Sequence, residues 1–208
     1  MKSSGIVKTA VGAAEPVRGL YNPEEFRDNC GFGMIAHQRG VASHKLLQTA
    51  IESLTCMTHR GGIAADGKTG DGCGLLLQMP TAFMRLCAST LLGRELKTTF
   101  AVGMVFMSRE PAAQDEVRKA FENAAQEFDF TVATWRVVPT QSDICGEIAL
   151  EQLPQIEQAF LETDSASHEE GAARLFMSRR RVESAMAGDA DCYICSLSDR
   201  VISYKGLV

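Results

Sequence analysis

The sequence contains no long apolar run. Its apolar stretches fall well short of the ~18 residues that a membrane-spanning helix requires, so we expect no membrane segment. The N-terminus, Met1-Lys2-Ser3-Ser4, has a lysine but is not followed by the apolar core of a secretory signal. We therefore expect a cytoplasmic protein.

Positive charge is also in short supply. The chain has 21 Lys and Arg against 26 Asp and Glu, a formal net charge of -5, which argues against a nucleic-acid surface. With 45% hydrophobic residues it is not a disordered acidic tail, and its 208 residues suit one globular domain. The seven cysteines, an odd number spread along the chain, are typical of free thiols in a reducing compartment.

The sequence has one C-x-x-C pair and no second pair of this kind. Cys192-Tyr193-Ile194-Cys195 has the spacing of metal and redox sites, but no second pair completes four ligands. The segment also reads as a strand, in which residues three apart point to opposite faces. We expect no metal site in this chain.

What the sequence does contain is a cysteine in a suggestive position. The stretch from Cys30 to His37 predicts a strand whose first side chain is left reachable. If the bond between Asn29 and Cys30 were cut, Cys30 would carry an α-amine (pKa ~8) beside a thiol (pKa ~8.5), and the amine could take the thiol proton. Uncut, Cys30 has no base, and most free cysteines are buried and unreactive.

Four motifs in order add to this position: Cys30-Gly31-Phe32-Gly33, Ser43-His44-Lys45, His59-Arg60-Gly61-Gly62 and Thr69-Gly70-Asp71-Gly72. Together they resemble the class II glutamine amidotransferase domain of the glutamate synthase family, in the large (alpha) subunit of the bacterial enzymes. The resemblance runs from about Asn29 to Leu207. It implies that residues 1–29 are a leader or propeptide and that 30–208 are the N-terminal part of the amidotransferase domain.

The resemblance implies an α+β fold of the N-terminal-nucleophile hydrolase type. This fold is a four-layer αββα sandwich, here incomplete at its C-terminal side. It also implies hydrolysis of glutamine to glutamate and ammonia, with Cys30 as the nucleophile. Arg60, Gly61, Gly62 and Asp71 would bind and orient the substrate. An arginine suits this work because its fork of donors can grip carbonyls or a carboxylate in a fixed direction.

The same resemblance implies partners in the whole protein. Ammonia would pass to a synthase domain that converts 2-oxoglutarate to glutamate. That part would carry FMN and a 3Fe–4S cluster, and a small (beta) subunit would carry FAD and take electrons from NADPH. We expect none of these cofactors in the present segment.

Two later motifs of the family are missing, Arg-Phe-Ser-Thr-Asn and His-Asn-Gly-Glu, which supply the glutamine-binding arginine and the oxyanion donors. Each lost donor lowers the rate on the order of 100- to 1000-fold. We therefore expect an N-terminal fragment that is inactive by itself. A non-catalytic docking module of the same fold stays open as an alternative, and retention of the leader before Cys30 would favour it.

Residues 62–69 also satisfy the phosphate-loop pattern G-x-x-x-x-G-K-[ST]. A phosphate loop must follow a strand and open a helix, whereas this segment follows a predicted helix and leads into the strand-like Leu75-Leu76-Leu77. We interpret the glycines as a tight loop in which Asp66 bonds to the loop backbone. A nucleotide-binding protein is a distant third reading.

The rest of the chain predicts alternating elements. Apolar periodicity indicates helices at 44–58 (capped by Ser43 and burying one stripe), 80–92, 111–128 and 171–187. Apolar or alternating runs indicate strands at 98–107, 130–138, 192–197 and 201–204. We also expect a short helix containing Ile156 and Phe160, and a polar surface loop at 162–170.

Overall fold

The computed structural model describes residues 31–57, 63–70, 72–164 and 168–206. The chain divides into two units, residues 1–32 and 33–208, and of the first only Gly31 and Phe32 are described. The second unit contains the helices α1 (His44–Thr55), α2 (Thr81–Leu92), α3 (Pro111–Glu127), the 3₁₀ turn η2 (Ser142–Ile144), α4 (Glu147–Glu151) and α5 (His168–Ala185). Its strands are β1 (Cys73–Gln78), β2 (Phe100–Met107), β3 (Thr131–Val137), β4 (Gln155–Glu162), β5 (Tyr193–Ser198) and β6 (Val201–Gly206).

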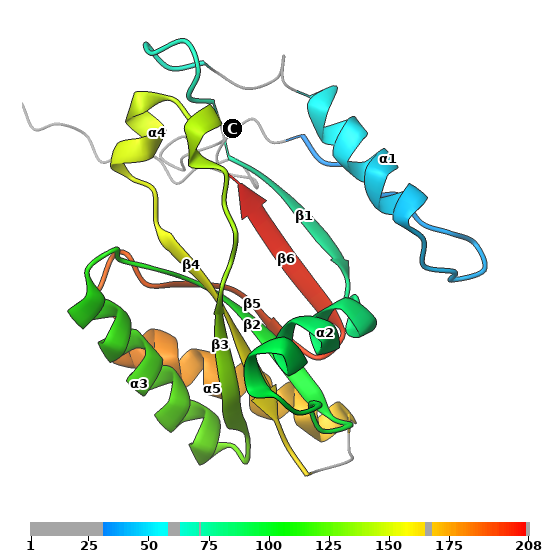
Figure 1. Ribbon diagram of the computed structural model, residues 1–208, viewed down its shortest axis with the longest axis vertical. Helices are drawn as coiled ribbons and strands as arrows, with labels where there is room; N and C mark the ends of the chain where they lie inside the picture. The colour runs from blue at the N-terminus through cyan, green and yellow to red at the C-terminus, as the bar shows by residue number, and fades with distance from the viewer. Residues whose placement is uncertain (1–30, 58–62, 71, 165–167, 207–208) are drawn as a thin grey trace, which may run out of the picture. The chain divides into compact units, whose positions relative to one another are not determined.

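A four-stranded antiparallel sheet forms the centre of this unit, with the strand order β3-β4-β2-β5 (Figure 1). Gly103 in β2 stands opposite Ala159 in β4 on one side and Leu197 in β5 on the other. All of β2 is buried except Phe106, which is half-buried. A strand covered on both faces reads as a continuous apolar run, and this is how β2 reads in the sequence.

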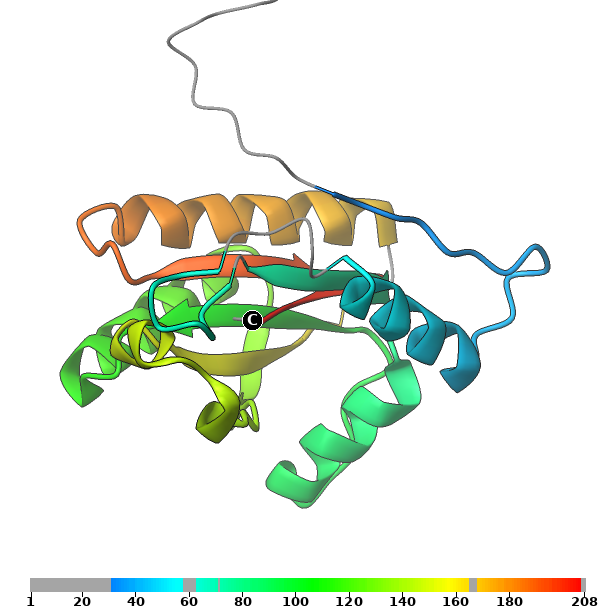
Figure 2. The same ribbon diagram turned by 90° about the horizontal axis from the view of Figure 1, so that it is seen from above.

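Helices α3 and α5 cover one face of this sheet and pack against each other. Alternate residues of β2 point to this face because side chains along a strand alternate. The buried members of this core are Ala101, Val105, Met107, Val117, Phe121, Ala124, Ala125, Phe130, Ala159, Leu161, Leu175, Val182 and Ile194. Figure 2 shows α5 and α2 on opposite sides of the strands.

A second core lies on the opposite face, under α2 and β6. Its buried members are Met79, Met84, Ala88, Leu96, Phe100, Val102, Met104, Phe160 and Ile202. Strand β6 pairs with β1 in a separate two-stranded antiparallel sheet, with Leu77 opposite Ile202. The expected mixture of helices and strands is therefore present, and the structure shows that both sheets are antiparallel.

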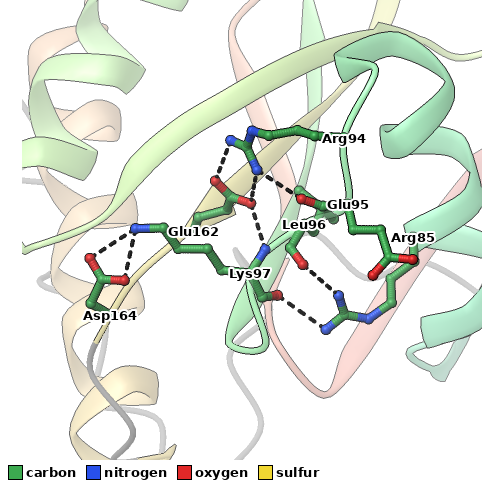
Figure 3. A network of polar contacts seen from close by, with 7 residues as sticks. All are labelled: Arg85, Arg94, Glu95, Leu96, Lys97, Glu162 and Asp164. Atoms are coloured by element: carbon green, nitrogen blue, oxygen red, sulfur yellow. Dashed lines mark hydrogen bonds and ion pairs between the residues drawn. The ribbon is translucent and has the colours of Figure 1, made fainter.

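A polar network fixes the connection between α2 and β2 (Figure 3). The Arg94 guanidinium binds both oxygens of the buried Glu162 carboxylate at 2.9 and 2.8 Å, and Lys97 N donates to Glu162 Oε1 at 2.7 Å. Arg85 donates to the carbonyls of residues 96, 97 and 98 and lies over the Phe100 ring. The end of the central strand β4 is thus held by charge-assisted bonds.

Most of the predicted helices and strands are confirmed. Ser43 caps α1, with its hydroxyl accepting from Leu46 N at 3.2 Å, and Pro111 stands at the start of α3. The apolar stripe of α1 is only half-buried, however, and Ile51 is 48% exposed. Among the described residues, no helix combines the length and apolar character needed to cross a membrane.

Three expectations were wrong. The segment with Ile156 and Phe160 is the central strand β4. A spacing of four residues is typical of a helix, but it also places two side chains on the same face of a strand. Both faces of β4 are covered, so its apolar residues do not alternate strictly with polar ones. Glu162 belongs to this strand and is 4% exposed, and residues 168–170 belong to α5, so the expected polar loop of residues 162–170 is shorter at both ends. Residues 31–37 form no strand, and none of the described strands pairs with them.

The last two strands are confirmed, but they join different sheets. Strand β5 lies at the edge of the four-stranded sheet and β6 pairs with β1. The turn between them is closed by the Ser198 hydroxyl, which accepts from Arg200 N at 3.0 Å and Val201 N at 3.3 Å. The connection therefore links the two sheets.

Candidate functional site

The loop of residues 63–70, here called the 63–70 loop, connects the end of α1 to the start of β1. Ile63 and Gly70 form an antiparallel bridge across its base, and Ala64 N donates to Thr69 O at 2.7 Å. Gly67 takes a positive φ of 68°, which a glycine adopts without strain. The loop thus closes on itself, as its glycines predict.

Asp66 is the centre of this loop. Its Oδ1 accepts from Lys68 N at 3.0 Å and Thr69 N at 2.8 Å, and its Oδ2 accepts from the Thr69 hydroxyl at 2.5 Å. The hydroxyl and then these backbone donors hold the pKa of the Asp66 carboxyl well below its usual range. The expected bonding of Asp66 to the loop backbone is confirmed.

The loop also reaches α4, some 80 positions further along the chain (Figure 1). Asp66 Oδ2 accepts from Ile148 N, and the Thr69 hydroxyl oxygen accepts from Ala149 N, both at 3.3 Å. These are two of the free N–H groups in the first turn of α4. We call this pair of side chains the Asp66–Thr69 clamp.

Gly146 makes the close approach of α4 possible. A Cβ atom at this position would overlap Asp66 Oδ2 and Thr69 Oγ1. The N-cap residue of α4, Gly146, has no side chain to accept a hydrogen bond from the first turn. Asp66 and Thr69 of the loop accept these bonds instead. Any larger residue at position 146 would push α4 away from the loop.

The phosphate-loop alternative is not supported by this geometry. The segment that matches the pattern is followed by strand β1, which begins at Cys73, and not by a helix. The phosphates of a bound nucleotide would therefore lack the helix N-terminus on which they normally rest. Lys68 is exposed on the loop.

The predicted site residues Cys30, Arg60, Gly61, Gly62 and Asp71 lie outside the described residues. Their roles therefore stay predictions. The described residues adjacent to them in the sequence are Gly31, Ile63, Gly70 and Gly72.

A row of hydrogen-bonded side chains, centred on the buried Gln158, joins the two sheets, and no pattern in the sequence indicated it. Arg136 Nη1 donates to Gln158 Oε1 at 2.9 Å, and Gln158 Nε2 donates to Tyr204 Oη at 3.3 Å. Gln158 is fully buried, and burial raises the pKa of the Tyr204 hydroxyl. These hydrogen bonds connect β6 to the central sheet and so support the β1–β6 pair.

The C-x-x-C cysteines point to opposite faces of the sheet. Cys192 packs against the core under α3 and α5, whereas Cys195 packs against the core under α2. Burial raises the pKa of the Cys192 thiol to about 11 and also raises that of Cys195. Within the described part of the chain, no group of three or more His, Cys, Asp or Glu residues could hold a metal ion.

Comparison with known proteins decides the family. Residues 30–208 match the sequence profile of the class-II glutamine amidotransferases. The chain belongs to this family. The family name implies glutamine as the substrate, and an N-terminal-nucleophile hydrolase fold fits it.

Curated relatives confirm the resemblance read from the four motifs. The chain is 38% identical over 202 residues to the glutamate synthase [NADPH] large chain of Azospirillum brasilense, covering 95% of this chain and 13% of the relative. It is 36% identical over 204 residues to the ferredoxin-dependent glutamate synthase 2 of a Synechocystis species, covering 96% and 13%. The Bacillus subtilis glutamate synthase [NADPH] large chain is 33% identical over 194 residues, covering 92% and 13%. The chain thus spans about an eighth of the length of these relatives.

Proposed function

We propose that residues 30–208 are the N-terminal part of the glutaminase domain of a glutamate synthase large chain. We further propose that removal of residues 1–29 frees Cys30 as the nucleophile. The observation that carries this proposal is the family match, which begins at residue 30. A nucleophile and its base then occupy one residue, the first of the mature domain.

The reaction follows from that arrangement. The α-amine of Cys30 takes the thiol proton, and the thiolate sulfur attacks the side-chain amide carbon of glutamine. When the tetrahedral intermediate collapses, the C–N bond breaks and the ammonium group of Cys30 returns a proton to the leaving nitrogen, which departs as ammonia. Water then attacks the thioester, the amine accepts its proton, and glutamate leaves with the thiol restored.

Four residues are proposed to hold the substrate, and they flank the 63–70 loop in the sequence. Arg60, Gly61 and Gly62 precede it and Asp71 follows it. The Arg60 guanidinium would bind carbonyl or carboxylate oxygens with its fixed fork of donors, and the two glycines would allow close backbone approach. The closed base of the loop supports this proposal because it joins both motifs to one bridge.

We propose the four-layer αββα sandwich for the complete domain. Two incompletely covered apolar surfaces support it. One is the outer face of β1, where Leu76 is 69% exposed, and the other is the half-buried apolar stripe of α1. Such apolar faces are normally covered by a further layer. A structure of the whole domain tests this directly.

For the whole protein we propose the chemistry that the resemblance to the glutamate synthase family implies. Ammonia would reach a synthase domain with FMN and a 3Fe–4S cluster, where 2-oxoglutarate becomes glutamate. A small (beta) subunit would supply electrons from NADPH through FAD. The relatives also include ferredoxin-dependent and NADH forms, so activity should be compared with NADPH, NADH and reduced ferredoxin as donors.

N-terminal sequencing and intact mass of the native full-length protein test the nucleophile. A mature chain that begins at Cys30, and whose glutaminase activity is lost in Cys30→Ala but kept in Cys56→Ser, is the expected result. Cys56 is an exposed free thiol in the C-cap of α1 and serves as the matched control. A mature chain that keeps residues 1–29 and shows no glutaminase activity would favour a docking module instead.

This chain by itself is expected to be inactive even after removal of residues 1–29 has left Cys30 at its N-terminus. It lacks the two motifs that supply the glutamine-binding arginine and the oxyanion donors, and each lost oxyanion donor lowers the rate on the order of 100- to 1000-fold. Glutaminase assays that compare this chain with the complete domain check the expectation. Equal turnover by the two proteins would contradict it.

A further inference from the structure

The Asp66–Thr69 clamp does more than close its own loop. The bonds from Asp66 to Lys68 and Thr69 suffice to fix the local turn. The bonds to Ile148 and Ala149 add nothing to that turn, yet they use the second oxygen of Asp66 and the Thr69 hydroxyl. They attach the loop to another part of the domain.

Little else among the described residues holds the 63–70 loop in place. None of its residues is buried, and Ile63, its largest apolar side chain, is 70% exposed. Apolar packing therefore contributes little to its position. Among the hydrogen bonds between described residues, only those of the clamp connect the loop to a distant segment.

The position of this loop matters because of what its two ends are joined to. Ile63 and Gly70 are bridged at its base, and they are covalently bonded to Gly62 and Asp71. Both neighbours are proposed substrate-orienting residues. A shift of the loop would move the attachment points of both motifs together.

We propose that Asp66 and Thr69 are positioning residues for glutamine binding. By fixing the 63–70 loop to α4, they hold the glycine motif and Asp71 in the orientation that accepts the substrate. This inference rests on the proposed glutaminase function. The clamp acts on substrate affinity and leaves the reactivity of the Cys30 thiol unchanged, because the proton acceptor of Cys30 is its own amine.

The test uses the full-length, processed protein with a substitution that keeps the shape of the side chain. Thr69→Val removes the hydroxyl that donates to Asp66 and accepts from Ala149 N, whereas Thr69→Ser keeps it. We expect the KM for glutamine to rise about tenfold in Thr69→Val, since small misplacements in a site have large effects. We expect kcat within about twofold of wild type, and Thr69→Ser should behave as wild type.

Asp66→Asn provides an independent second variant. The variant keeps Oδ1, which accepts from the backbone N–H groups of the loop. It replaces Oδ2 by an amide N–H₂ group, which cannot accept the hydrogen bond from Ile148 N. It should raise the KM in the same way. If Thr69→Val does not fold, Asp66→Asn together with Thr69→Ser still decides the matter.

A destabilised control separates positioning from a general loss of stability. Val182→Ala removes fully buried atoms from the core under α5, far from the loop in the sequence, and should lower the melting temperature without raising the KM. A second readout is covalent labelling of Cys30. The glutamine analogue 6-diazo-5-oxo-L-norleucine should label Thr69→Val more slowly than wild type, whereas iodoacetamide should label both at the same rate.

The outcomes are distinct. If wild type hydrolyses glutamine and Thr69→Val and Asp66→Asn keep its KM, the positioning role is wrong and the glutaminase function stands. If kcat falls while KM stays constant, or if Val182→Ala raises KM equally, the positioning role is also wrong. If mature wild type neither hydrolyses glutamine nor reacts with the analogue at Cys30, both proposals fall.

Discussion

The Arg118 guanidinium of α3 binds both oxygens of the Glu157 carboxylate in β4. Its Nη2 donates to Oε1 at 2.6 Å and its Nε to Oε2 at 3.0 Å. Glu157 is 1% exposed, whereas the Arg118 side chain is 28% exposed. One arginine from the covering helix thus neutralises a charge in the central strand of the sheet.

Loss of Arg118 should therefore be costly. Arg118→Ala leaves an uncompensated carboxylate in the sheet, and we expect the free energy of unfolding to fall by about 3 kcal/mol. Arg181→Ala is the control, because the Arg181–Glu127 pair is 61% and 49% exposed and such surface pairs contribute at most about 1 kcal/mol. Urea titration of the 208-residue chain measures both, and equal losses would contradict the expectation.

The same glycine-to-alanine substitution should have opposite effects at two positions. Gly146→Ala places a methyl group against Asp66 and Thr69 and should destabilise the chain by about 1–3 kcal/mol. Gly171→Ala lies within α5 with nothing near its added Cβ, and should stabilise by about 0.5–1 kcal/mol. Melting temperatures check this, and a shift of the same sign in both variants would refute it.

The sequence predicted the elements whose residues carry a regular pattern. Helix α3 buries Val117, Phe121 and Ala124 at the expected spacing of three and four, and Pro111 marks its start. Strand β2 reads as an apolar run because both of its faces are covered. In these segments local pattern and tertiary environment agree.

Strand β4 could not be predicted because its pattern depends on distant partners. It carries Glu157, Gln158 and Glu162 among apolar residues, and each of these polar groups is buried. Their partners lie on other elements, such as Arg118 on α3 and Arg136 on β3. The sequence alone does not show these partners. Apolar residues spaced by four with polar residues between them therefore indicate a helix.

The candidate site was predictable in part. The order of the four motifs identified the family, and the bonding of Asp66 to its own loop followed from the local turn chemistry of aspartate. The bonds of the clamp to Ile148 and Ala149 did not follow, because the sequence does not show which loop meets which helix. Gly146 was the only available sign, since a glycine before a short helix permits close approach.

The Glu162 carboxylate should make stability depend on acid pH. Hydrogen bonds from Arg94, which outweigh the opposing effect of burial, lower the pKa of Glu162 below its ordinary value of 4.5. A lowered pKa in the folded state gives stability that is present above about pH 4.5 and lost as pH falls below it. Glu162→Gln should therefore cost about 1–2 kcal/mol at pH 7 and markedly less at pH 3.

Asp164→Asn is the control for this pH dependence. Asp164 binds Lys97 at 2.8 Å, but its side chain is 87% exposed, so its replacement should change stability little at either pH. Urea titrations at pH 7 and pH 3 compare the two variants with wild type. A Glu162→Gln deficit of equal size at both pH values would show that the charge of Glu162 is not what stabilises this corner.

The C-x-x-C cysteines should behave as separate, protected thiols. With a pKa of about 11, only about one Cys192 thiol in a thousand is ionised at pH 8, and the thiolate is the form that reacts. Iodoacetamide labelling followed by peptide mass mapping should therefore modify Cys192 at least about 50-fold more slowly than the exposed Cys56. The rate at Cys192 should be the same with and without a chelator, because Cys192 and Cys195 point to opposite faces and cannot share a metal ion. A chelator that accelerated labelling of both cysteines would contradict this arrangement of the two side chains, since only a shared metal ion would protect both thiols together.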